Sequence, residues 1–291
     1  MTNWVRWRFA LSGAIVFTLS ACVVSTDFTS GSSRDELYEI TSYNETIVLD
    51  TIERMMHERA LYVFDIDNTL LESPKKQFIG SDQWYKWQIE LPDSSPYKVD
   101  CLLQMQGAAY YFAHLEATEL GLSARLLPKL QESGKDVIAL TARSPQFRPQ
   151  TERELERNGF DFSSKMPLDF AGFPGTYLPS ASNKIAKPRA ASYQTGIAML
   201  AGQHKGEALK DLLNRIGAVE EYDFVIFFDD DEKNVDAVWQ SFLADQRTAI
   251  VFLYKAVDTS LEHYDLDEAA MAQEKIADAM SQFERNRGCD I

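Results

Sequence analysis

Short apolar segments alternate with helical patterns along most of the chain. Five of them have the length and composition of buried strands in a parallel sheet: residues 61–64, 137–143, 196–200, 223–231 and 248–253. Strands that alternate with helices favour a parallel sheet with right-handed crossovers. The pattern therefore predicts an α/β domain built on a doubly wound parallel sheet of about five strands.

The segments between these strands carry helical patterns. Asn44 is the expected N-cap of a helix that has Ile47, Val48, Ile52 and Met55 on one side. Further helices are expected within residues 93–121, 122–130, 150–158 and 261–283, and a short strand within 38–43. The stretch 167–188 is dense in Pro, Gly and Ser and predicts loops or a small hairpin.

Composition limits the size of the fold and its partners. The chain has 291 residues, of which 45% are hydrophobic, enough for one substantial core and an insertion or small accessory domain. Its formal net charge is −15 at pH 7. This acidic balance argues against nucleic acids and anionic membrane surfaces as partners.

The N-terminal segment has the pattern of an export signal. Two arginines precede an apolar run at residues 9–21 that is too short to span a bilayer comfortably. The run ends in Leu-Ser-Ala-Cys22, which resembles the lipobox of bacterial lipoproteins, where the cysteine becomes the lipidated first residue. The resemblance implies a signal peptide at 1–21, a tether at 22–36, and export from the bacterial cytoplasm. The mature chain would be lipid-anchored to a membrane on its periplasmic or cell-surface side. An ordinary secretory signal cut near this point is the alternative.

Two cysteines remain beyond the export signal. Cys101 and Cys289 could form a disulfide in an oxidising compartment or stay as two free thiols, and their spacing does not decide between these states. The four histidines are scattered, and none has the spacing of a zinc ligand pair. Zinc is therefore not expected.

Acidic side chains follow directly after two of the predicted strands. Asp65 and Asp67 come after the strand at 61–64, while Asp229 and Asp230 end a later one. Ligands of open α/β sheets bind beyond the carboxyl ends of the strands. Carboxylates at such a place suit Mg²⁺, which takes oxygen ligands and keeps several waters. An acidic loop after an ordinary strand is the alternative.

Hydroxyl and cationic side chains occupy related places. Thr141 and Arg143 lie at the end of the predicted strand 137–143. Lys205 follows the predicted strand 196–200 and begins a predicted helix. A cation at a helix start beside a strand end can reach a phosphate. Lys205 is therefore preferred over Lys184 and Lys187, which lie in the loop-like stretch.

Taken in chain order, these motifs resemble the haloacid-dehalogenase-like superfamily. The shared features are an Asp-x-Asp-x-Thr strand end, a Thr strand end, a Lys and an Asp-Asp strand end, between about residues 43 and 254. The resemblance implies a Rossmann-like domain over 37–291, with a small cap insertion near 71–121 and a further insertion near 160–195. It also implies a Mg²⁺-dependent phosphomonoester hydrolase acting on a small phosphorylated substrate.

The resemblance assigns a role to each acid. Asp65 would attack phosphorus and form an aspartyl-phosphate. Asp67 would protonate the leaving oxygen and then take a proton from water. The expected metal ligands are Asp65, Asp67 through its backbone carbonyl, Asp229 and Asp230.

Other residues would complete the site. Thr141 and Lys205 would bind the phosphoryl oxygens. Arg143 would either add a bidentate phosphate contact or form a structural ion pair. Asn234 is expected to support the metal site, and Asp231 to lie at the surface or cap a helix.

The match to the superfamily leaves other activities open. Secreted lipoprotein acid phosphatases of this superfamily have Glu where this chain has Asn68, so the chain departs from that subgroup. The presence of Asp67 argues against dehalogenase activity, which dispenses with the second acid. A binding lipoprotein that keeps the Mg²⁺ pocket without turnover, and a phosphotransferase, are the alternatives.

A tryptophan-containing stretch follows the first motif. Gly80-Ser-Asp-Gln-Trp84 resembles a stretch of uncharacterised bacterial proteins in the same superfamily. Its aromatic residues, with Trp87, could form a substrate-facing flap or pack an insertion onto the core. Packing is favoured, because large aromatic side chains chiefly supply buried area.

Overall fold

The computed structural model describes residues 36–73, 78–112, 114–245, 247–257, 260 and 264–286. The predicted signal peptide, Cys22, the tether as far as residue 35 and Cys289 lie outside these residues, so export and lipid anchoring stay predictions. Within the described ranges, no helix combines the length and the apolar character that a membrane span requires.

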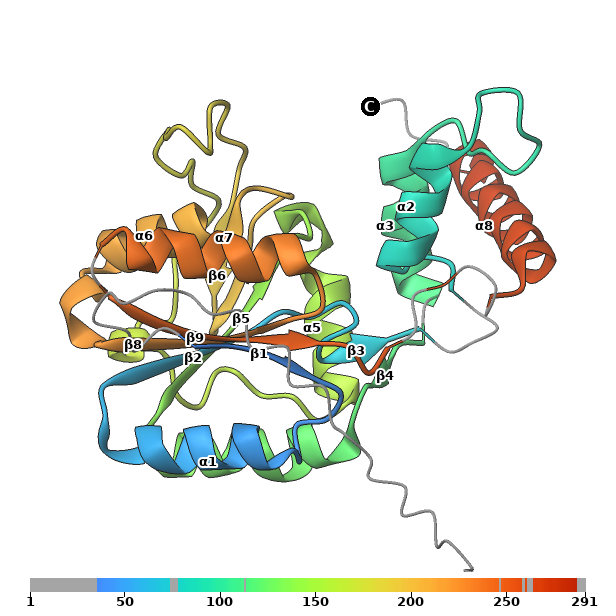
Figure 1. Cartoon of the computed structure of the whole chain (residues 1–291). Helices are drawn as coiled ribbons and strands as arrows, with labels where there is room; N and C mark the ends of the chain where they lie inside the picture. The colour runs from blue at the N-terminus through green and yellow to red at the C-terminus, as the bar shows by residue number, and fades with distance from the viewer. Residues whose placement is uncertain are drawn as a thin grey trace, which may run out of the picture. The chain divides into compact units, whose positions relative to one another are not determined.

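A mostly parallel sheet forms the centre of the fold (Figure 1). Its strands are β1 (Glu36–Ile40), β2 (Ala60–Phe64), β5 (Asp136–Thr141), β6 (Ser192–Gln194), β7 (Ile197–Met199), β8 (Phe224–Asp229) and β9 (Thr248–Tyr254). They lie in the order β1-β9-β8-β2-β5-β7-β6, and only the β6–β7 pair is antiparallel. The expected α/β sheet is confirmed, but it has seven strands rather than about five.

The two additional strands lie at the edges of the sheet. β1 occupies the first part of the segment expected as a short strand and takes one residue from the expected tether. β6 and β7 form a hairpin through Thr195 and Gly196, whose φ angles are +48° and +75°. Positive φ at both central residues is the geometry of a type I′ turn. A Cβ on Gly196 would lie 2.2 Å from the carbonyl oxygen of Phe162, so glycine is required there.

Helices cover both faces of the sheet, as Figure 1 shows for α1 on one side and α6 and α7 on the other. The helices of the first face are α1 (Thr46–Arg54), α4 (Leu127–Glu132) and α5 (Arg148–Arg157), and those of the second are α6 (Lys205–Ile216) and α7 (Glu232–Leu243). Side chains of β2 point alternately to the two faces of the sheet. Tyr62 packs in the hydrophobic cluster with α1, α4 and α5, and Val63 in the cluster with α6 and α7. All five residues of β2 are buried, which explains its unbroken apolar sequence.

Between β2 and β5 the chain forms a small helical insertion. It contains β3 (Leu71–Glu72), α2 (Asp82–Glu90), α3 (Leu102–Phe112) and β4 (Glu116–Ala117). The C-terminal helix α8 (Leu266–Asn286) packs against it, through a cluster that includes Trp84, Trp87, Met105 and Ile276. The prediction that the tryptophans pack rather than form a flap is confirmed, but they pack the insertion against α8 rather than onto the core of the sheet. The expected helix at 93–121 is shorter, because a loop precedes α3 and β4 follows it.

Short helical turns connect these elements: η1 (Met55–His57), η2 (Leu122–Leu126), η3 (Pro145–Phe147), η4 (Pro167–Asp169) and η5 (Val219–Glu221). The expected N-cap of the first helix was wrong. α1 begins at Thr46 after Glu45, whose carboxylate accepts hydrogen bonds from the backbone N–H groups of Thr41 and Ser42. The carboxylate thus closes the preceding turn and leaves Asn44 outside the cap.

Candidate active site

The sheet brings the acidic strand ends together. β2 lies between β5 and β8, with Phe64 opposite Phe228 in the register. The backbone N–H of Asp65 donates to the carbonyl oxygen of Phe228 at 2.9 Å, which continues the pairing by one residue. Asp65 and Asp229, far apart in sequence, are therefore neighbours at the carboxyl edge of the sheet.

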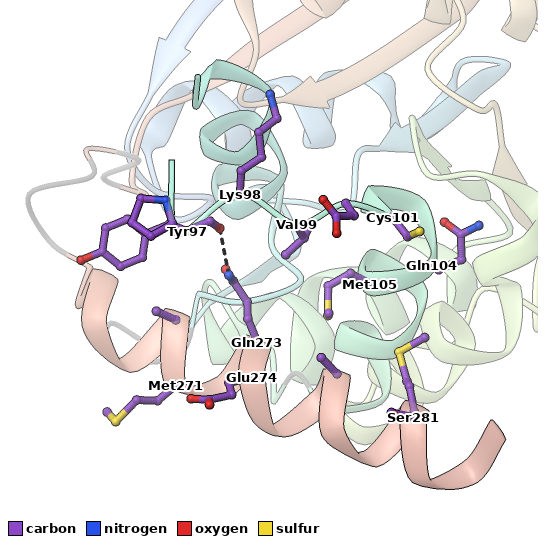
Figure 2. Close-up of a pocket in the computed structure, with 15 residues that line it drawn as sticks. Tyr97, Lys98, Val99, Cys101, Gln104, Met105, Met271, Gln273, Glu274 and Ser281 are labelled. Atoms are coloured by element: carbon purple, nitrogen blue, oxygen red, sulfur yellow. Dashed lines mark hydrogen bonds between the residues drawn. The ribbon is translucent and has the colours of Figure 1, made fainter. Parts of the chain in front are cut away.

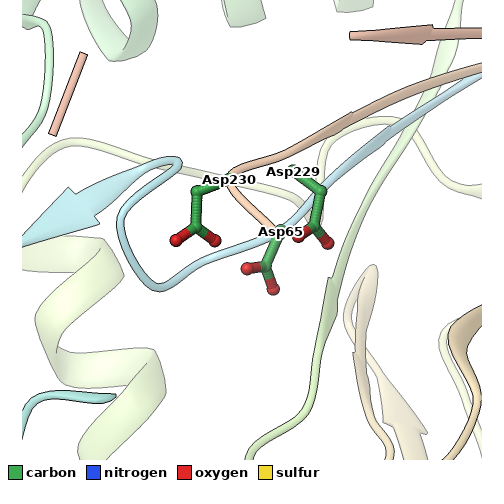
Figure 3. A group of neighbouring side chains, drawn as sticks. All are labelled: Asp65, Asp229 and Asp230. Atoms are coloured by element: carbon green, nitrogen blue, oxygen red, sulfur yellow. The ribbon is translucent and has the colours of Figure 1, made fainter. Parts of the chain in front are cut away.

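Three carboxylates converge at this edge, as Figure 3 shows. One oxygen each from Asp65, Asp229 and Asp230 lies within 4.8 Å of the other two. Lys205 Nζ lies 2.5 Å from Asp65 Oδ1 and donates to Asp229 Oδ2 at 2.6 Å. Its side chain is only 1% exposed, so it forms a buried bridge between the two acids. Neither Lys184 nor Lys187 has this position, since both are exposed.

Burial and mutual repulsion shift the titration of these groups. Burial raises the pKa of Asp65 well above its ordinary value; Lys205 opposes this rise, and Asp229 and Asp230 add to it. Burial, followed by the charge of Asp229, raises the pKa of Asp230 to about 7. For Lys205, burial disfavours the charged form, but Asp229 and Asp65 outweigh burial and raise its pKa.

We expect the stability of the metal-free protein to fall as the pH rises from about 4 to about 7. The pKa of Asp230 is about 7 in the folded protein, against 3.8 for an ordinary aspartate. Between these values the folded state holds a proton that the unfolded chain has released, so raising the pH favours unfolding. Thermal melts in chelator across this range measure the effect, and Asp230→Asn should make the profile flatter. Identical profiles for the two proteins would contradict the expectation.

Asp67 lies outside the carboxylate cluster and pairs with Arg143. The Arg143 guanidinium donates from Nε to Asp67 Oδ2 at 2.9 Å and from Nη2 to Asp67 Oδ1 at 2.6 Å. Its third nitrogen donates to Thr151 Oγ1 at 3.1 Å, and its Cζ lies 4.5 Å from the centre of the Tyr110 ring. Of the two roles considered for Arg143, the structure thus has the ion pair. These three hydrogen bonds use three of the five N–H donors of the guanidinium.

Asp229 is held by the start of helix α7. Its Oδ1 accepts hydrogen bonds from the backbone N–H of Asp231 at 2.9 Å and from Asn234 Nδ2 at 3.0 Å. Asp231 itself accepts from the backbone N–H of Lys233 and caps the helix, as expected. These contacts leave Asp229 and Asp230 as the inward-facing acids of the three.

Thr141 ends β5, the other neighbour of β2. The register places Phe64 opposite Ala139, so Thr141 lies at the same edge of the sheet as the acids. Its side chain is fully buried, and its Oγ1 accepts from the backbone N–H of Arg143 at 3.1 Å. The hydroxyl hydrogen stays available for another acceptor at this edge.

The donor set fits a hard divalent cation. All three clustered side chains offer oxygen, the ligand type that Mg²⁺ prefers. Together with Asp67 they make four carboxylates, against the two cations, Lys205 and Arg143, that contact them among the described residues. Asp65, Asp229 and Asp230 are therefore the side chains that would hold Mg²⁺, which keeps several waters among its ligands.

Sequence reasoning missed two neighbours of the acids. Asn68 Nδ2 donates to Asp230 Oδ2 at 3.1 Å, and Gln83 Nε2 on helix α2 donates to Asn68 Oδ1 at 2.6 Å. In the sequence, Asn68 stands out only as a departure from a phosphatase subgroup. Gln83 lay within the Gly-Ser-Asp-x-Trp stretch, the one signal in the sequence that marked its neighbourhood.

A groove of about 630 Å³ lies elsewhere, between the 96–105 segment and helix α8 (Figure 2). Its wall includes apolar side chains such as Val99, Met105 and Met271. Cys101 is exposed at this groove. None of the acids discussed above lines it, so the groove is separate from the candidate active site.

Comparisons with known proteins bear on the family of the chain. A search of the curated proteins finds no match. A family model matches a range of the chain that includes Asp65, Asp229 and Asp230 as well as Thr141 and Lys205. Residues 38–287 match the family described as "Protein of unknown function (DUF2608)", and the chain therefore belongs to this family.

Proposed function

We propose that the chain is a Mg²⁺-dependent phosphomonoester hydrolase of the haloacid-dehalogenase-like type, exported and lipid-anchored through Cys22. One observation carries the proposal: Asp65, Asp229 and Asp230 converge around a buried lysine at the carboxyl edge of a parallel sheet. Hydrolysis of a phosphomonoester needs a nucleophile, a proton for the leaving oxygen and positive charge on the phosphoryl oxygens. The site has a candidate for each need.

Asp65 is the proposed nucleophile. Its carboxylate attacks phosphorus, the bond from phosphorus to the leaving oxygen breaks, and an aspartyl-phosphate forms. Lys205, already in contact with Asp65, would neutralise phosphoryl oxygens that arrive beside this carboxylate. The Thr141 hydroxyl would donate to one of them.

Asp67 is the proposed acid and base. It donates a proton to the leaving oxygen in the first step and takes one from the water that releases inorganic phosphate in the second. Its two hydrogen bonds from Arg143 fix the carboxyl group in one orientation. Stacking on Tyr110 and the bond to Thr151 in turn fix Arg143.

A bound Mg²⁺ ion would be held by Asp65, Asp229 and Asp230, and by the backbone carbonyl of Asp67 that the superfamily resemblance implies. It would supply charge neutralisation and alignment for the phosphoryl group. Asn234 and the backbone N–H of Asp231 orient Asp229 for this task.

The test is an assay of the soluble form lacking residues 1–22 on a panel of phosphomonoesters, with Mg²⁺ and with chelator. We expect hydrolysis that depends on the metal. Activity that persists in chelator would contradict the proposal. The absence of activity on every substrate would favour a binding protein, and transfer of phosphate to an added alcohol in place of water would indicate a phosphotransferase.

Asp67→Asn is expected to lower kcat by about 10²–10⁴-fold, the range for loss of a general acid or base. The loss should be smaller for p-nitrophenyl phosphate than for an alkyl phosphate, because an acidic leaving group needs less protonation. Steady-state rates on the two substrates measure this difference. An equal loss on both would argue against proton donation by Asp67.

A further inference from the structure

Helix α2 is fixed at its start by the stretch that follows the first motif. Ser81 accepts from the backbone N–H of Trp84 at 3.1 Å and caps the helix. The Trp84 indole is fully buried and donates to Gln273 Oε1 of helix α8 at 2.7 Å. Gly80 has a φ of +84°, and a Cβ there would lie 3.1 Å from Ala109 of α3. The neighbouring residue Gln83 therefore has a well-defined position.

Gln83 points toward the acids rather than toward solvent. Its side chain is buried, and Nε2 donates to Asn68 Oδ1 at 2.6 Å. Asn68 is buried as well, and its Nδ2 donates to Asp230 Oδ2 at 3.1 Å. The backbone of Asn68 is in the left-handed region, with a φ of +59°, and its N–H donates to the carbonyl oxygen of Leu71. A continuous chain of two hydrogen bonds thus joins helix α2 to the carboxylate cluster.

Gln83 determines which end of the Asn68 amide faces Asp230. An asparagine amide has an acceptor at one end and a donor at the other. The amide N–H of Gln83 donates to Asn68 Oδ1 and so fixes the orientation of the Asn68 amide. In this orientation Asn68 Nδ2 faces Asp230 and donates to it. Without that donor, the amide could turn and set Oδ1 against Asp230 Oδ2, which would bring two acceptors together.

We propose that Gln83 is a positioning residue of the cation site: through Asn68 it orients the Asp230 carboxylate toward Asp65 and Asp229. The proposal rests on the Mg²⁺ site of the proposed function. It gives the Gly-Ser-Asp-x-Trp stretch a role, because the stretch anchors α2 to α8 on one side and to the acids on the other. Groups that orient a metal ligand in this way affect metal affinity by about 10–100-fold when lost.

Calorimetric titration of the full chain with Mg²⁺ tests this inference without any measurement of turnover. Gln83→Met keeps the length of the side chain and removes its donor, and we expect Mg²⁺ to bind about 10-fold more weakly. Gln88→Met is the matched control. Gln88 is a buried glutamine on the same helix, but its amide donates to the carbonyl oxygen of Tyr97 and to Gln273 Oε1. Its substitution should leave Mg²⁺ affinity unchanged.

A double mutant shows whether Gln83 acts through Asn68. If it does, Gln83→Met combined with Asn68→Ala should bind Mg²⁺ as Asn68→Ala does alone, since the second change removes the same path. Unchanged affinity in Gln83→Met, an equal loss in Gln88→Met, or additive losses in the double mutant would each overturn the inference. A wild-type chain that binds no Mg²⁺ would overturn the cation site itself, and with it the proposed function.

Discussion

Asp65→Asn is expected to lower kcat/KM for phosphomonoesters by more than about 10⁴-fold, a loss typical of removing a catalytic nucleophile. The amide oxygen of asparagine can still accept from Lys205, so the buried contact survives while the nucleophile is lost. Removing one of several neighbouring carboxylates should also relieve repulsion with Asp229 and Asp230. We therefore expect a folded protein with a melting temperature close to that of the wild type.

Chemical trapping gives this variant a second measurement. Brief reaction with a phosphate-labelled substrate followed by acid quenching should leave covalent label on the wild type and none on Asp65→Asn. The label should be released by hydroxylamine, as acyl phosphates are. Full activity in the variant, or label that resides on another residue, would contradict a nucleophilic role for Asp65.

The central strands of the sheet could be located from the sequence alone. β2, β5, β8 and β9 are buried on both faces, so each reads as a nearly continuous apolar segment and can be located without any partner. The edge strand β6 lacks this signal. It has only three residues, and its hairpin turn to β7 uses Thr195 at positive φ, where Asn or Gly is the usual residue.

Within the site, the predictable residues were those that follow strand ends. Parallel strands place their carboxyl ends at one edge, so Asp65, Asp229 and Thr141 had to lie near one another once the sheet was right. Pairing between side chains was not predictable in the same way. Arg143 pairs with Asp67 because its guanidinium also donates to Thr151 and stacks on Tyr110. These two residues belong to helices α5 and α3, which the sequence does not place beside Arg143. The role of Gln83 could not be predicted for the same reason, since its partner Asn68 is fifteen residues away in the sequence.

Lys205→Met is expected to destabilise the metal-free fold by about 3–5 kcal/mol, the usual cost of removing one partner from a buried ion pair. Lys205 bridges Asp65 and Asp229 in a place where the lysine side chain and Asp229 are almost fully buried. Its loss would leave the carboxylates of Asp65, Asp229 and Asp230 facing one another without a cation from the described residues in contact with them. Chemical denaturation in chelator measures the change. Lys187→Met is the control: Lys187 is exposed, and a surface substitution should change stability by less than about 0.5 kcal/mol.

The dependence of this destabilisation on pH and on Mg²⁺ shows whether its origin is electrostatic. Lowering the pH should shrink the destabilisation, because burial already raises the pKa of Asp65 and its protonation removes one of the opposed charges. Mg²⁺ should also shrink it, since a cation bound by the three acids replaces part of the missing positive charge. The double variant Asp65→Asn, Lys205→Met should be more stable than Lys205→Met alone, because it buries one fewer unpaired carboxylate. A loss that is independent of pH, of Mg²⁺ and of Asp65 would mean that Lys205 stabilises the fold by packing rather than by neutralising the acidic strand ends.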